Sequence, residues 1–138
     1  MYKIKPLTYE YSSLEPYIDT RTVGIHYNNH YKGYLNKLNN LLDKENYDYR
    51  YPLEELPKHI DEFSLESRGD ILFNAGGVLN HELYFANISP NKNTIPTGLL
   101  KAAIDKEYGS FENFKKEFID KTKKINRVWI YFFSRKRW

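Results

Sequence analysis

The chain has 138 residues, of which 41% are hydrophobic, and carries a net charge of +3 with no Cys, which suits one compact domain or part of two. The lack of Cys excludes disulfides and thiolate ligands, so any metal site must use nitrogen and oxygen ligands. The longest strictly apolar run, Val128 to Phe133, is far shorter than the roughly 20 residues that span a bilayer. No secretory apolar segment opens the chain, so we expect a cytoplasmic protein with no membrane partner.

Positive charge is concentrated at the end of the sequence. Residues 121–138 hold seven Lys or Arg and no acidic residue, whereas the preceding residues hold 14 basic and 18 acidic residues. A nucleic-acid-binding domain usually spreads basic residues over its folded surface. Binding to nucleic acid would depend on this tail alone, so we rank it last among the functions considered.

The first half of a helical pair is predicted early in the chain. The first eighteen residues, with Pro6 and Pro16, read as an extended arm. A long helix is then predicted from a cap at Asp19 or Thr20 to Leu42. Its apolar and aromatic residues recur at the spacing of one helix face: Val23, Tyr27, Tyr31, Tyr34, Leu38, Leu41 and Leu42.

A connector and a second helix should follow. Residues 43–63 contain two prolines and predict a connector with one short turn at Leu53 to Leu56. The second helix is predicted from near Ser64 to about Phe85. The pair Gly76-Gly77 within it costs about 1 kcal/mol per Gly relative to Ala. We therefore expect close approach of another backbone or of a bound group at these glycines.

Two further helices and a strand complete the pattern. A third helix is predicted from a cap at Thr97 to Glu107, and Gly109-Ser110 then reads as the end of one helix and the cap of the next. The run Val128 to Phe133 favours a β-strand, which is not stable alone in water. The last helix carries a stripe of aromatic residues that we expect to be partly exposed: Phe111, Phe114 and Phe118.

Three histidines and one tyrosine are candidates for chemistry. His26 and His30 are four residues apart in the first predicted helix, and Tyr34 follows at the same spacing, so all three can line one wall. Spacing alone favours ordinary core-edge or surface histidines over a metal pair. His81 would meet His26 if the helices are antiparallel, or would simply hydrogen-bond across the pair. His59 reads as a solvent-facing connector residue and receives no role.

Several segments resemble the iron/manganese superoxide dismutase family. Gly24 to Asn39 is similar to that family's H-x3-H-x3-Y-x3-L-N segment, and Ala75 to Phe85 is similar to its second metal-binding helix. Shorter agreements occur at Leu14 to Ile18, Ile88 to Pro90 and Tyr108 to Lys115. The resemblance covers roughly residues 5–118, and these motifs occur in the family's order.

The resemblance implies a mainly α fold. We expect a long antiparallel helical hairpin followed by further helices, with a remnant β-strand of a truncated α+β domain. Residues 1–90 would form the hairpin domain with half of the metal site. Residues 91–138 would form an incomplete α+β domain with an aberrant basic tail.

The resemblance also implies a metal site that dismutes superoxide to oxygen and hydrogen peroxide. His26 and His81 would be metal ligands, Tyr34 would gate substrate access, and His30 would shape the approach to the metal. The metal would be Mn or Fe. Manganese is slightly favoured because Gly77 stands where iron-type relatives tend to carry Gln, although Tyr84 is more iron-like.

The family's Asp-x-Trp-x-His motif, which provides its other two ligands, is not present in these 138 residues. We therefore expect Mn or Fe to bind weakly in this chain and the family's homodimer to be compromised. The alternative to a superoxide dismutase is a catalytically inactive truncated module that associates with other subunits.

Overall fold

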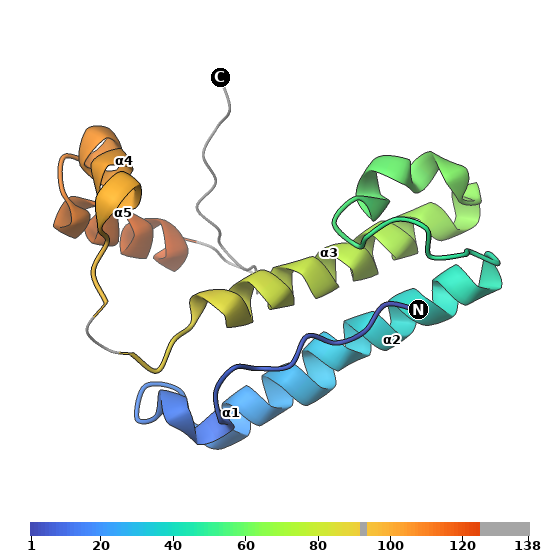
Figure 1. Cartoon of the computed structure of the whole chain (residues 1–138), viewed down its shortest axis with the longest axis horizontal. Helices are drawn as coiled ribbons and strands as arrows, with labels where there is room; N and C mark the ends of the chain where they lie inside the picture. The colour runs from blue at the N-terminus through green and yellow to red at the C-terminus, as the bar shows by residue number, and fades with distance from the viewer. Residues whose placement is uncertain (92–93, 125–138) are drawn as a thin grey trace. The chain divides into compact units, whose positions relative to one another are not determined.

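The computed structural model describes residues 1–91 and 94–124, and these fall into two compact units, Met1–Pro90 and a second that begins at Asn91. All regular elements among the described residues are helical (Figure 1). The prediction of a mainly α fold is therefore confirmed for this part of the chain. The predicted strand at Val128 to Phe133 lies outside the described residues. None of the described helices is long and apolar enough to span a membrane.

The first arm of the hairpin is one continuous helical run made of three parts. Helix α1 (Thr20–Ile25) leads into the π-helical segment η2 (His26–Tyr31), which leads into α2 (Lys32–Lys44). Asp19 caps the run, because its carboxylate accepts the backbone N–H of Thr22 at 2.9 Å. The predicted helix start is thus confirmed. At η2 the helix departs from α geometry, and the wider π turn changes the direction in which side chains project.

The second arm is α3 (Leu65–Asn87), which Ser64 caps by accepting the N–H of Ser67. It packs chiefly against α2 and runs back beside it (Figure 1). Buried apolar side chains from both arms and the connector form one core, and burial of such surface is the main stabilising term of the unit. The best-buried large side chains are Tyr31, Leu38, Leu42, Leu56, Ile71 and Val78.

The connector is more ordered than its sequence predicts. Besides a turn that begins at Leu53, it contains the 3-10 helix η3 (Leu56–Glu62), with Pro57 in its first turn. A proline at the start of a helix loses no backbone hydrogen bond and has a suitable φ. Leu53, Leu56 and Phe63 are buried, so the connector closes the end of the hairpin core.

The N-terminal arm has no regular structure over residues 1–7, as predicted, and is tied to the hairpin by hydrogen bonds. The prediction of an extended arm through residue 18 is wrong at the 3-10 helix η1 (Tyr11–Leu14) and the turn that follows it. The Tyr2 backbone exchanges two bonds with the Asn39 side chain, at 3.1 and 3.0 Å. Tyr27 donates its hydroxyl to the Lys5 carbonyl at 2.9 Å, and Tyr9 donates to the Phe85 carbonyl at 3.2 Å. Half-buried tyrosines with a bonded hydroxyl are expected of such an aromatic chain.

The second unit contains α4 (Gly98–Tyr108) and α5 (Phe111–Lys123). Gly109 between them has a φ of +78°, the left-handed conformation that glycine tolerates best, and Ser110 caps α5 by accepting the N–H of Asn113 at 3.1 Å. Both predictions for this pair are confirmed. The predicted aromatic stripe of α5 is partly exposed, and Phe114, Lys115, Phe118 and Ile119 line a shallow groove.

Candidate metal centre

The hairpin brings His26 and His81 together from its two arms. His26 opens the π segment η2, His81 lies on α3, and their ring centroids are 4.8 Å apart at an interplanar angle of 77°. His30 is exposed, and its ring lies 5.9 Å from that of His26. Antiparallel packing, on which the sequence-based expectation of a His26–His81 contact depended, accounts for this juxtaposition.

The tautomer of His81 follows from a hydrogen bond within α3. Its Nδ1 lies 2.6 Å from the carbonyl oxygen of Gly77. A carbonyl can only accept, so Nδ1 carries the proton and donates it. The lone pair is then on Nε2, the nitrogen that remains available to a metal. His81 is 6% exposed, so the ring is held within the hairpin.

Both facing imidazoles favour the neutral form. Burial, together with the smaller effects of the nearby His81 and His30, lowers the pKa of His26 to about 4. Burial also lowers the pKa of His81, although its bond to the Gly77 carbonyl acts in the opposite direction. At neutral pH each ring therefore offers a nitrogen lone pair, the form that binds metal ions.

Tyr34, on α2, lies against the His81 imidazole. Its ring centroid is 5.3 Å from that of His81 and 5.8 Å from that of Phe73. A Cβ added at Gly77 would lie 2.4 Å from Cδ1 of Tyr34, whereas one added at Gly76 would meet nothing within 4 Å. The predicted close approach thus occurs at Gly77 alone. It comes from the Tyr34 side chain, not from a backbone or a bound group.

Sequence reasoning gave no site role to several aromatic residues that surround the pair. The Tyr31 ring is parallel to that of His81 at 6.0 Å, and His26 lies 4.8 Å from Tyr84 and 5.2 Å from Phe85. Tyr31 had been recognised only as part of a core stripe. The helical pattern in the sequence is the same for a residue of the core and for one that lines the site. Only the position of α3 in the structure distinguishes these two roles.

His59 lies in the connector, as predicted, with a side chain that is 34% exposed. Its ring stacks on that of Tyr51 at 3.7 Å, and its Nδ1 lies 3.3 Å from Oε1 of Glu62. Both partners belong to the connector region, and His59 does not take part in the imidazole pair.

The donor set fits part of the shell of Mn or Fe. Two neutral imidazoles with available nitrogens are ligands that suit these metals. Among residues 1–91 and 94–124, however, no group of three or more His, Cys, Asp or Glu side chains is arranged to hold a metal ion. The described residues therefore bring two imidazoles together, fewer than the three side chains of such a group.

Acid should destabilise the metal-free hairpin between about pH 6.5 and pH 4. In this range the unfolded chain protonates His26, whereas the folded chain, with a pKa of about 4, does not. The free energy of unfolding therefore falls as the pH falls, by about 1–2 kcal/mol once solvent screening of a half-buried ring is allowed for. Urea titrations at several pH values should show a flatter profile for His26→Gln, and an unchanged profile would contradict this assignment.

The chain is similar to one protein-family model and to several curated proteins. Residues 1–89 match the family model for iron/manganese superoxide dismutases, alpha-hairpin domain. The Mn superoxide dismutase of Listeria ivanovii is 40% identical over 117 residues, which are 85% of this chain and 58% of the relative. That of Escherichia coli (strain K12) is 37% identical, with 85% and 56% covered. The Mn/Fe superoxide dismutase of Methylomonas sp. (strain J) is 35% identical, with 85% and 57% covered.

The chain thus spans a little over half the length of these curated relatives. The match to the family model covers the whole hairpin, including both imidazoles of the pair. The chain belongs to the iron/manganese superoxide dismutase family.

Proposed function

We propose that His26 and His81 bind a Mn or Fe ion and that the protein acts in the dismutation of superoxide to oxygen and hydrogen peroxide. The observation that carries this proposal is the pair of neutral imidazoles, 4.8 Å apart, contributed by the two arms of the hairpin. Relatives named as Mn or Mn/Fe superoxide dismutases support the choice of metal.

The ligands beyond this pair would come from elsewhere. Residues 125–138 contain no His, Asp, Glu or Cys, so they add none of the strong protein ligands that these metals use. Water or a polypeptide outside this sequence would complete the shell. A half-site of two imidazoles should bind metal more weakly than a full set, and occupancy would depend on that second source.

A bound Mn or Fe would supply one-electron chemistry, so that one superoxide is oxidised to oxygen and another is reduced to peroxide. The residues of this chain would bind the metal, orient the ligand rings and restrict the access of superoxide. The Nδ1–H of His81 holds its ring to the Gly77 carbonyl, so that Nε2 would be the nitrogen that binds the metal. Tyr34, half-buried over His81, would gate the approach of superoxide, and the exposed His30 would shape its entrance.

Manganese is slightly favoured over iron. The Tyr34 ring occupies the space that a side chain at position 77 would need. No longer residue fits there without displacement of Tyr34, and this includes the Gln that the family resemblance associates with iron. Tyr34 therefore fills the space beside His81. A glycine at position 77 thus agrees with manganese, the metal named for several relatives.

Metal analysis of the purified full chain tests the proposal. In equilibrium dialysis against excess Mn or Fe, the chain should bind metal and remove superoxide, and His81→Ala should abolish both, since one of two imidazoles is lost. His59→Ala is the matched control because its ring lies outside the pair, and it should behave as the parent chain. A chain that stays metal-free in excess Mn and Fe, or a His81→Ala variant that retains metal, would exclude this site.

A second candidate is a catalytically inactive module that associates with another subunit. It is favoured by the apolar side chains that α3 exposes, Leu72 at 40%, Phe73 at 67% and Leu83 at 46%, since such surfaces often mark interaction sites. In the metal experiment it predicts a folded, helical chain with neither metal nor activity. Analytical ultracentrifugation with a full-length family subunit would then show the complex.

A further inference from the structure

Two adjacent residues of α3 hold Tyr31 at its two ends. The Tyr31 ring is parallel to the His81 imidazole, with an interplanar angle of 6° and centroids 6.0 Å apart. Its hydroxyl donates to Oε1 of Glu82 at 3.1 Å. Successive residues of a helix project about 100° apart, so His81 faces the ring while Glu82 reaches the hydroxyl. Tyr31 is 1% exposed, so the ring lies within the hairpin core.

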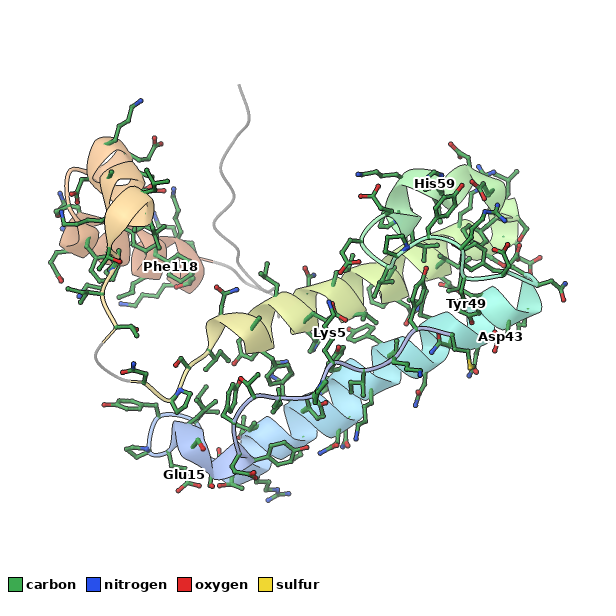
Figure 2. All side chains as sticks on the ribbon, viewed as in Figure 1. Lys5, Glu15, Asp43, Tyr49, His59 and Phe118 are labelled. Carbon is green, nitrogen blue, oxygen red and sulfur yellow. The ribbon has the colours of Figure 1, made fainter. Side chains whose placement is uncertain are left out.

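Glu82 is itself fixed by Lys5 of the N-terminal arm. The Lys5 ammonium lies 2.5 Å from Oε2 of Glu82, whose side chain is only 10% exposed. The Lys5 backbone N–H also donates to the Tyr31 hydroxyl at 3.1 Å. Figure 2 shows Lys5 on the arm between the two long helices. Lys5, Tyr31 and Glu82 therefore form a closed hydrogen-bonded set, as a largely buried carboxylate requires.

This set bears on the orientation of the His81 ring. The terminal torsion of a histidine side chain is broad, so neighbouring groups must hold its plane. The Gly77 carbonyl fixes Nδ1, and the parallel face of Tyr31 restricts rotation of the ring about that bond. Tyr31 in turn can tilt unless its hydroxyl is held at the far end of the ring. The restraint on His81 thus passes through the Tyr31–Glu82 hydrogen bond.

We propose that Glu82 is a positioning residue for His81, acting through the Tyr31 hydroxyl to keep the imidazole in the orientation that presents Nε2. The inference rests on the proposed function, because it gives Glu82 a role toward a proposed metal ligand. Groups that orient a ligand are often as important for metal affinity as the ligand itself.

The connector contains a second, similar set, with Arg50 as its cation, which provides a matched control. The Tyr51 ring is parallel to that of His59 at an angle of 6°. Its hydroxyl donates to Oε1 of Glu62 at 3.0 Å, and Glu62 is paired with Arg50. Loss of Glu62 therefore removes a tyrosine–carboxylate–cation set of equal chemistry that has no contact with His81.

Proton NMR of the metal-free full chain tests the proposal directly. Glu82→Ala should shift the His81 ring resonances and weaken the nuclear Overhauser contacts between the His81 and Tyr31 rings. Glu82→Gln should leave the His81 resonances and the His81–Tyr31 contacts unchanged, since its amide oxygen still accepts from the Tyr31 hydroxyl. Glu62→Ala should leave the His81 signals unchanged. Because no metal is present, these results are independent of whether the chain binds one.

A double-mutant cycle separates positioning from general stability. In a Tyr31→Phe background the hydroxyl is gone, so Glu82→Ala should cause no further change at His81. The proposal is overturned by unchanged His81 signals in Glu82→Ala, by a Gln variant as perturbed as the Ala variant, or by an undiminished effect in the Phe background. If Glu82→Ala does not fold, Tyr31→Phe alone decides, since it must shift the His81 ring in the intact chain.

Discussion

Alanine at position 77 is expected to destabilise the hairpin and to displace Tyr34 from the imidazole pair. The added Cβ would lie 2.4 Å from Cδ1 and 2.6 Å from Cγ of Tyr34, well inside van der Waals contact. Either the ring rotates away from His81 and Phe73 or the two arms separate. Overpacking of this kind typically costs about 1–3 kcal/mol, more than the gain in helix propensity of about 1 kcal/mol.

Gly76 is the matched control for this prediction because it precedes Gly77 in the same helix. A Cβ there meets nothing within 4 Å, so Gly76→Ala should stabilise the chain by up to about 1 kcal/mol. Urea unfolding followed by circular dichroism measures both changes. Combining Gly77→Ala with Tyr34→Ala should cost less than the sum of the single changes, because the clash is removed. Equal effects at the two glycines would contradict the close packing of Tyr34.

Local chemistry explains why much of the fold could be predicted. The side chains of Asp19, Ser64 and Ser110 each accept a backbone N–H at a helix start, and such caps leave a clear sequence signal. The left-handed φ of Gly109 is likewise a property of one residue. These features need no knowledge of the rest of the chain, so the positions of the long helices follow from the sequence.

Features that depend on the partner arm could not be predicted in the same way. The π segment His26–Tyr31 cannot be told from an α-helix in the sequence, because no residue type marks its i→i+5 hydrogen bonds. The sequence predicts a close approach at the glycine pair, but not that the Tyr34 side chain makes it at Gly77. The pairing of Lys5 with Glu82, 77 residues apart, has no local signal at all. The candidate site was thus predictable in its histidines and not in the residues that orient them.

Leu38→Ala should be among the most damaging single substitutions in the chain. Leu38 is 0% exposed and lies in the hairpin core with Leu42 and Ile71. Truncation of a buried Leu removes apolar contacts and leaves a cavity, at a typical cost of about 2–5 kcal/mol. A small domain has only about 5–15 kcal/mol of total stability, so this variant should unfold at a much lower urea concentration.

Leu65, the first residue of α3 and 84% exposed, is the control for Leu38. Leu65→Ala should change stability by no more than about 0.5 kcal/mol, and a loss comparable to that of Leu38→Ala would contradict the packing described for the core. Leu38 follows Tyr34 by one helical turn of α2. Since His26 and His81 come from different arms, their juxtaposition exists only while the two arms stay packed. Leu38→Ala should therefore lose the His26–His81 ring contact in NMR spectra at the urea concentration where the helices unfold, and not before.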